Sequence, residues 1–386
     1  MRVNKAIQSI GTESAFAVLA QANALRAEGK DILSLAIGAP DFATPSNIVA
    51  AAKRALDDGH HFYTPTKGLE DLRAAIAQDL QTRRGLEVHI ENILVSPGAK
   101  PIMTYAMQIF GEPGAEILYP DPGFPIYRSM IAFSGARPVP VPMRAAHGLS
   151  FDPDELLALI TPQTRLIILN SPGNPTGGIV TRAAMDKLAE GLKAWPDVAI
   201  LSDEIYSRLL YDGAEHVSCL DYPHLRGRTI LLDGWSKTYS MTGWRLGYGI
   251  WPEQLIDYAE RLQVNSASCA SAPVQMAGIE ALIGPQEGAE AMHAAFQARR
   301  DVMVDALTSL PGFTCAVPKG AFYAFPNIEG TGYSADALQQ HLLLNAGVAT
   351  VSGTSFGSHG EGHIRFSYAC APEVIEDAVE RIRQVL

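Results

Sequence analysis

The chain has 386 residues and a formal net charge of −11, with 47% hydrophobic and 18% charged residues. This length and composition are typical of a soluble protein with a large buried core, and they exclude a disordered chain. The acidic charge, without any long basic run, argues against nucleic acid or an anionic membrane surface as a partner. No apolar run is long enough for a bilayer span or a secretory leader. The four cysteines are scattered, so we expect a cytoplasmic protein with neither a disulfide framework nor a metal site.

Helix and strand patterns alternate from residue 46 onward. One helix is predicted from Ser46, as its N-cap, to Gly59, and a second from Leu69 to Arg84, ending at Gly85. Short apolar runs bounded by Gly, Pro, Asp or Asn then predict strands buried on both faces. These runs are Ile93–Val95, Ile117–Tyr119, Leu166–Leu169, Val198–Leu201, Ile230–Leu232 and Leu246–Ile250. Because helical patterns separate most of them, the predicted fold class is α/β, with a mainly parallel sheet flanked by helices.

The pattern changes after about Ser271, where helices dominate. The predicted helices are Ala272–Leu282, Ala289–Leu310, Ala335–Asn345 and Pro372–Leu386, and short strands are predicted around Tyr323 and over His363–Tyr368. The first 45 residues, with a helix at Ser14–Glu28, are placed with this part of the chain. We therefore expect a large domain over residues 46–271 and a smaller α+β domain from residues 1–45 and 272–386.

One segment, DGWSKTYSMTGWRLGY from Asp233 to Tyr248, lies between two predicted buried strands. Burial there disfavours a charged lysine, so the pKa of Lys237 is expected to fall towards that of a usable nucleophile. A neutral amine can attack an aldehyde to form a Schiff base, and Arg245 can supply positive charge for a phosphate. Taken alone, Lys237 would be interpreted as a surface lysine in a loop, and the surrounding segment reverses that interpretation. No GxGxxG or GxxxxGK[ST] motif is present, so a dinucleotide dehydrogenase or a P-loop enzyme has no support.

Seven further motifs accompany this segment in a fixed order. They are GAPDF from Gly38, YTPTKG from Tyr63, SPGAK from Ser96, PDPGF from Pro120, NSPGNPTG from Asn170, SDEIY from Ser202 and HIRFSY from His363. From about Gly38 to Tyr368 the chain resembles the class I/II aminotransferases of the fold-type I pyridoxal 5′-phosphate (PLP) enzymes, above all the archaeal and thermophile types of aspartate aminotransferase. The resemblance implies PLP as the cofactor, residues 46–271 as the PLP-binding domain, and a homodimer with shared active sites.

The resemblance also implies catalytic roles for three residues. Lys237 holds PLP and moves the Cα proton of the substrate. Asp203, at the end of a predicted strand, keeps the pyridine nitrogen protonated, so that the ring acts as an electron sink. Tyr206 is placed to hydrogen-bond the ring's 3-oxygen, together with Asn174, which is also expected in the substrate site. A turn-forming Asn in NPTG or a capping Asp at a strand end would be the structural alternatives.

The remaining cofactor contacts implied by the resemblance concern the phosphate and the ring face. Gly98, Ala99 and Lys100 follow a strand and open a helix, a position that favours a phosphate. Arg245 is expected on the same phosphate, and Phe124 is expected to stack on the ring. Tyr63 is expected to reach the phosphate in the neighbouring subunit. Related enzymes often carry a serine where this chain has Gly234, which leaves one phosphate hydrogen bond in doubt.

Arg365 is expected to clamp the substrate α-carboxylate bidentately, with the Gly38 backbone assisting. For a distal carboxylate, residues 264–298 offer neither Arg nor Lys, so Lys100 is the remaining candidate. Lys100 could instead serve only the phosphate, and the apolar segment Ala15–Ala17 would suit neutral donors.

The expected activity is therefore ping-pong transfer of an amino group, through pyridoxamine phosphate, between an amino acid and a 2-oxo acid such as 2-oxoglutarate. Aspartate or glutamate is the preferred donor. An aromatic or alanine aminotransferase, or a PLP-dependent C–S lyase or decarboxylase, is the alternative.

Overall fold

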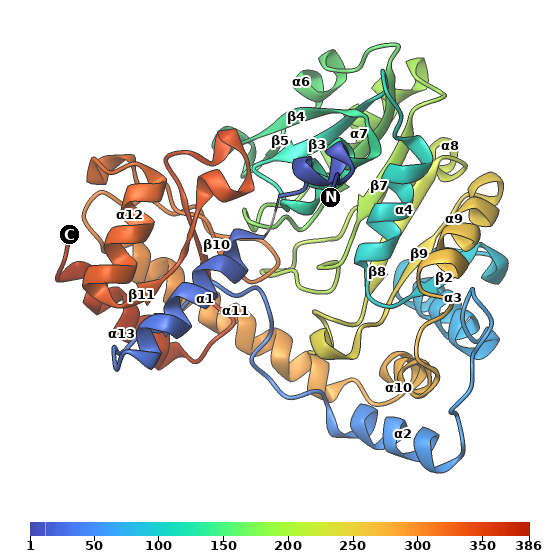
Figure 1. Ribbon diagram of the computed structural model, residues 1–386, viewed down its shortest axis with the longest axis horizontal. Helices are drawn as coiled ribbons and strands as arrows, with labels where there is room; N and C mark the ends of the chain where they lie inside the picture. The colour runs from blue at the N-terminus through green and yellow to red at the C-terminus, as the bar shows by residue number, and fades with distance from the viewer. Residues whose placement is uncertain (12) are drawn as a thin grey trace.

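A large mixed sheet organises the structure, a computed structural model that describes residues 1–11 and 13–386 (Figure 1). Its eight strands run in the order β2-β9-β8-β7-β6-β3-β4-β5, and the five from β8 to β4 are mutually parallel. β9 is antiparallel to both of its neighbours, and β5 is antiparallel to β4. The bounds are β2 Ile93–Ser96, β3 Glu116–Asp121, β4 Arg137–Arg144, β5 Ser150–Phe151, β6 Thr164–Asn170, β7 Ala199–Asp203, β8 Thr229–Gly234 and β9 Gly247–Ile250.

Helices cover both faces of this sheet, which makes the central strands apolar on both sides. Along β3, Ile117 and Tyr119 belong to one buried cluster, whereas Leu118 belongs to another on the opposite face. Alternation of side chains along a strand produces this division. The surrounding helices are α2 Ser46–Asp57, α3 Glu70–Arg84, α4 Lys100–Phe110, α5 Ile126–Ser134, α6 Pro153–Ala158, α7 Arg182–Gly191, α8 Pro223–Arg226, α9 Glu253–Ser266 and α10 Ala272–Ile283.

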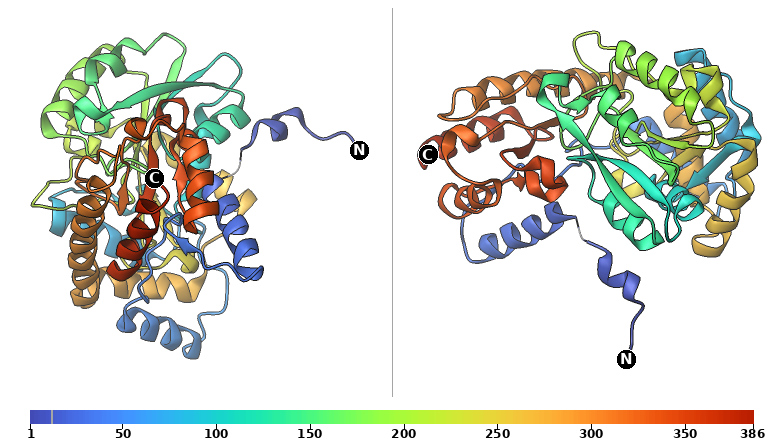
Figure 2. Two further views of the ribbon diagram at one scale, coloured as in Figure 1. Left: turned by 90° about the vertical axis from the view of Figure 1, so that its left-hand side faces the viewer. Right: turned by 90° about the horizontal axis from the view of Figure 1, so that it is seen from above.

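A second group of elements lies beside the large sheet, and we call it the small unit (Figures 1 and 2). β1 pairs with β11 in parallel, and β10, β13 and β12 form an antiparallel sheet. The small unit comprises α1 Ser14–Ala27, β1 Leu33–Ser34, α11 Glu287–Thr308, β10 Tyr323–Ala324, α12 Ala335–His341, β11 Val348–Ala349, β12 Val351–Ser352, β13 Ile364–Ser367 and α13 Pro372–Arg383. Helix α10 packs on α2 and α3. The predicted division at residue 271 stays a prediction, and we propose that the boundary follows α10.

The α/β class and the mainly parallel sheet predicted from the sequence are confirmed. All six predicted strands of the large sheet are present, and α3 ends at Gly85, which adopts the left-handed conformation with φ 63°. The predicted cap of the preceding helix was wrong: Ser46 is the first helical residue, and Pro45 is the N-cap.

Strand β4 was missed because its sequence, RPVPVPMR, alternates with proline. Arg137 N–H donates to Ala115 in the neighbouring chain segment, so the N–H positions of alternate residues face β3. Pro138, Pro140 and Pro142 therefore all face the other edge, where β5 pairs only with residues 143 and 144. A strand tolerates proline where no ladder donor is needed.

Candidate active site

A cavity of about 540 Å³ opens where the carboxyl ends of the parallel strands meet the small unit. Asn170 and Asp203 are the last residues of β6 and β7, and Lys237 follows β8. Ligands bind at this edge in open α/β sheets. The sequence-predicted residues Gly38, Ala99, Lys100, Phe124, Asn174, Asp203, Tyr206, Lys237, Arg245 and Arg365 all line the cavity.

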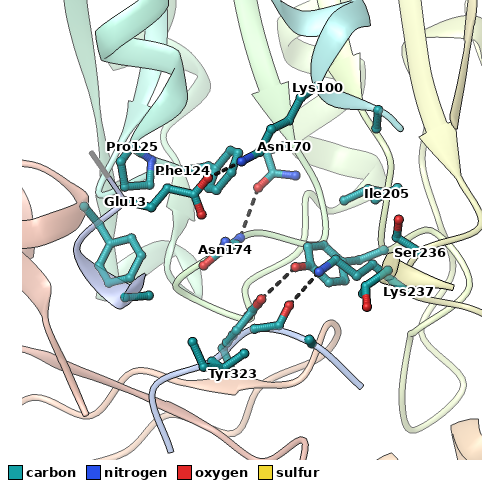
Figure 3. Close-up of a pocket in the computed structure, with 18 of the residues that line it drawn as sticks. Glu13, Lys100, Phe124, Pro125, Asn170, Asn174, Ile205, Ser236, Lys237 and Tyr323 are labelled. Atoms are coloured by element: carbon teal, nitrogen blue, oxygen red, sulfur yellow. Dashed lines mark hydrogen bonds and ion pairs between the residues drawn. The ribbon is translucent and has the colours of Figure 1, made fainter. Parts of the chain in front are cut away.

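Lys237 lies in the loop between β8 and β9, as its segment predicted. Its Nζ donates a hydrogen bond of 2.6 Å to the carbonyl oxygen of Gly38, and Figure 3 shows the side chain reaching into the cavity. Burial, helped by the positive charge of Arg365, lowers the pKa of Lys237 to about 8. A substantial fraction of this amine is therefore neutral at mildly alkaline pH, which suits a nucleophile or a general base.

Asp203 is almost completely buried at the base of the cavity. Its Oδ2 accepts a hydrogen bond of 2.5 Å from the Tyr127 hydroxyl, and its Oδ1 accepts one of 3.2 Å from the backbone N–H of Ile205. Burial raises the pKa of Asp203 to about 6, although both hydrogen bonds oppose the rise. No cation among residues 1–11 and 13–386 forms an ion pair with this buried carboxylate, which therefore suits a protonated heterocyclic nitrogen.

Arg365 lies in β13 and is only 3% exposed. Its Nη1 donates to Asn174 Oδ1 at 2.9 Å, its Nη2 donates to the carbonyl of Ala36, and its buried Nε has no hydrogen-bond partner. Within residues 1–11 and 13–386, no carboxylate forms an ion pair with this guanidinium. A buried cation in this state favours an incoming anion, and burial lowers its pKa from the ordinary value.

Two tyrosines occupy the floor between Arg365 and Lys237. The hydroxyls of Tyr206 and Tyr323 are 2.8 Å apart, and the Arg365 guanidinium lies 4.6 Å from the centre of the Tyr323 ring. Burial raises the pKa of Tyr206 well above its ordinary value, so its hydroxyl stays protonated at neutral pH.

A second positive region lies where α4 begins. A Cβ on Gly98, whose φ is +86°, would collide with the Arg245 guanidinium, so only glycine permits this approach. Ala99 is the N-cap of α4, and the first N–H groups of a helix lack intrahelical acceptors. The guanidinium and the helix start together suit a phosphate.

Lys100 and Phe124 lie side by side at the outer part of the cavity. The Lys100 ammonium lies 5.5 Å from the centre of the Phe124 ring and is ion-paired with Glu13 (Figure 3). Phe124 also meets Tyr127 edge to face, with centroids 5.8 Å apart.

Three predicted features lie elsewhere or differ from the resemblance. Gly98 is not part of the cavity lining and lies against the Arg245 guanidinium. Tyr63 is also outside the lining, and it is 89% exposed on this chain. A Cβ on Gly234 would stand 3.0 Å from both Gly247 Cα and Leu246 O, so the tight pairing of β8 and β9 explains a glycine there. Ser236, two residues on, lines the cavity.

Several lining residues were missed from the sequence, namely Glu13, Tyr127, Asn170, Ser236, Tyr323 and Phe356. Tyr127 and Tyr323 have the sequence context of ordinary core aromatics. Asn170 lies in the motif NSPGNPTG and Ser236 in the lysine segment from Asp233 to Tyr248, so these motifs are the sequence signal that could have identified both residues.

The residues present fit PLP. The cavity brings together an anion site at Ala99 and Arg245, a buried carboxylate, Asp203, an aromatic ring, Phe124, and the amine of Lys237. Charge and chemistry therefore match the phosphate, the ring nitrogen, the ring face and the aldehyde of the cofactor.

Such a site on a fold of this kind defines a PLP enzyme that acts on amino acids. The family profile described as Aminotransferase class I and II matches residues 30–382, and the chain belongs to this family. It is a PLP-dependent aminotransferase, and a C–S lyase or decarboxylase reading is not favoured.

Relatives and solved structures agree over nearly the whole chain. An aspartate aminotransferase of Pyrococcus horikoshii is 39% identical over 362 residues, covering 92% of this chain and 91% of the relative. An aspartate/prephenate aminotransferase of Cereibacter sphaeroides is 39% identical over 378 residues, covering 95% and 94%. The crystal structure of the aspartate aminotransferase from Rhizobium meliloti superposes with a TM-score of 0.95 at 35% identity, covering 100% of this chain and 98% of that one. Among the helices in the described part of the chain, none has the length and apolar character needed to cross a membrane.

Proposed function

We propose that this aminotransferase uses aspartate or glutamate as the amino donor and a 2-oxo acid such as 2-oxoglutarate as the acceptor. The observation that carries the proposal is the buried Arg365 guanidinium, which has no carboxylate partner among the described residues, in the same cavity as a second cation, Lys100. Two cations at separate places suit a substrate with two carboxylates. The activities named for the relatives support aspartate as the donor.

In the proposed mechanism, Arg365 binds the substrate α-carboxylate and thereby orients the Cα–H bond towards Lys237. PLP, when bound, supplies an electron sink for the negative charge that develops at Cα. The Nζ of Lys237 would accept the proton from Cα as a general base and would deliver it, as a general acid, to C4′ of the cofactor. In the cofactor-free chain burial lowers the pKa of Lys237 to about 8, so this amine is not held permanently in its protonated form.

The roles proposed for the other residues follow from their surroundings. Asp203 would hold a proton on the ring nitrogen, and the Tyr206 hydroxyl and the Asn174 amide, both in the cavity lining, would hydrogen-bond the ring's 3-oxygen. Arg245 and Ala99 would hold the phosphate, with Gly98 directly behind the guanidinium, and Phe124 would cover a ring face. Ser236 is a candidate for the phosphate hydrogen bond that Gly234 cannot make.

An aromatic donor is the second candidate. Four apolar side chains from α1, β12 and the segment after β1 line the cavity. They are Ala15, Phe16, Ile37 and Val351. Phe16 is largely exposed, and a bound aromatic side chain could cover it.

We also propose a homodimer in which Tyr63 of each chain serves the site of the other chain. The exposed neighbours Phe62 and Tyr63 support it, because large apolar side chains left in solvent mark association surfaces.

A panel of donors tests the proposed specificity. Aspartate, glutamate, alanine and phenylalanine are mixed with the PLP form in stopped flow, and the cofactor absorbance is followed. Aspartate or glutamate should give the highest second-order rate. A higher rate with phenylalanine would favour the aromatic alternative.

A further inference from the structure

The Glu13 carboxylate forms an ion pair with Lys100, the cation expected to bind the side-chain carboxylate of an acidic substrate. Glu13 precedes α1 in the small unit, whereas Lys100 begins α4 beside the large sheet, 87 positions later. Their ion pair therefore bridges two separate segments at the outer part of the cavity (Figure 3). Within the described lining, Glu13 and Asp203 are the only carboxylates, and Asp203 lies at the base.

Local helix structure does not account for this contact. Glu13 is the N-cap of α1, where an acidic side chain usually accepts a backbone N–H of the first turn. Its side chain makes no such capping bond. The carboxylate instead reaches Lys100. Its negative charge also favours the protonated forms of Lys237 and Arg365, because it raises the pKa of both groups against the effect of burial.

The exposure of the pair determines how easily it separates. The Glu13 and Lys100 side chains are 17% and 45% exposed. An ion pair with one partner this accessible is weak, because water screens it. A substrate carboxylate of the same charge and chemistry can therefore compete with Glu13 for Lys100.

We propose that Glu13 is a specificity-determining residue that acts as an internal competitor for the distal carboxylate of dicarboxylic substrates. With a neutral substrate the pair stays closed, and the substrate side chain meets an electrically balanced pair and apolar neighbours. With an acidic substrate, the substrate carboxylate replaces Glu13 on Lys100. This inference rests on the proposed function, since it concerns the same distal position.

Binding of two unreactive acids to the PLP-loaded enzyme isolates the effect. Succinate carries two carboxylates, and butyrate has the same four carbons with one. Removal of the competitor in Glu13→Gln should lower the Kd of succinate roughly two- to fivefold, given the small cost of breaking an exposed pair. The Kd of butyrate should stay within about twofold. Both are measured by absorbance titration of the cofactor.

Matched variants separate this effect from changes in net charge or folding. Glu28→Gln removes the same charge from the exposed end of α1, outside the cavity lining, and should leave both Kd values unchanged. In a Lys100→Met background, Glu13→Gln should no longer tighten succinate. An increased succinate Kd in Glu13→Gln, or an equal change for both acids, would overturn the inference, because Glu13 would then merely support Lys100 or the cavity wall. The donor panel with wild-type enzyme judges the proposed function, whereas this test compares wild type with Glu13→Gln, so the two failures give different results.

Discussion

The hydroxyl of Tyr127, in α5, lies 2.5 Å from Oδ2 of Asp203 at the end of β7. Both groups are fully buried, and the pKa of Tyr127 is raised well above its ordinary value by burial and by the neighbouring carboxylate. The phenol therefore stays a donor and stabilises the ionised form of Asp203. This hydrogen bond partly offsets the burial that raises the pKa of Asp203 to about 6.

Tyr127→Phe should make PLP binding more sensitive to acid. Asp203 has to be ionised to pair with a protonated ring nitrogen, so affinity for PLP falls as pH drops through the pKa of Asp203. A hydrogen bond to a charged group contributes about 1.5–3 kcal/mol, so its loss should raise that pKa by about one to two units. The Kd of PLP measured from pH 5 to 8 should rise at a higher pH in the variant. Tyr105→Phe, which loses a hydrogen bond to Ser266 outside the cavity lining, is the control. Superimposable profiles for Tyr127→Phe and wild type would contradict this role.

Asp203→Ala should keep PLP weakly and lose turnover by roughly a thousandfold, which corresponds to about 4 kcal/mol of transition-state stabilisation. The reason is the loss of the only buried carboxylate at the base of the described cavity lining. Asp203→Asn keeps the volume and removes the charge, so it should be nearly as slow if charge is the cause. The measurement is kcat with saturating PLP, supported by circular dichroism to establish folding. Near-normal turnover in either folded variant would exclude the assigned role.

Much of this site could be predicted because its residues lie at strand ends or in motifs. Asp203 and Lys237 follow buried apolar runs, and parallel strands bring such ends to one edge. The strands themselves could be predicted from short apolar runs, because helices cover both faces of the sheet and the strands are therefore apolar on both sides.

The rest depends on contacts that a single sequence does not contain. Glu13 reaches Lys100 across 87 positions, and Tyr323 joins Tyr206 across 117. Neither pair has a local pattern. Strand β4 was missed for a different reason, because its local sequence argues against a strand. Its alternating prolines remove backbone N–H groups, but the strand needs these donors only on the edge that faces β3.

Lys237 should carry the cofactor covalently. Borohydride reduction of the loaded enzyme, followed by peptide mass mapping, should place the phosphopyridoxyl group on the peptide that contains Lys237. Because burial lowers the pKa of Lys237 to about 8 in the cofactor-free protein, the rate of PLP capture should rise with pH and level off above about pH 8. Lys237→Arg, which stays charged, should give no reduced adduct. A label on another lysine would remove the basis of the assignment.

Subunit mixing tests whether the sites are shared between two chains. Tyr63 lies outside the cavity of its own chain and is almost fully exposed, whereas Lys237 is inside that cavity. In a dimer with shared sites, a Tyr63→Ala chain paired with a Lys237→Ala chain creates one site that has both intact residues and one that has neither. If each parent is nearly inactive, a mixture after subunit exchange should recover up to about a quarter of wild-type activity, because random pairing makes half the dimers hybrid and half of their sites intact. A control mixture of Lys237→Ala with Asp203→Ala, both within one chain's cavity, should recover none. Exchange is verified by native mass spectrometry with one chain isotopically labelled. Proven exchange without recovery in the Tyr63→Ala mixture would mean that each chain completes its own site, and the homodimer would then lose its catalytic role.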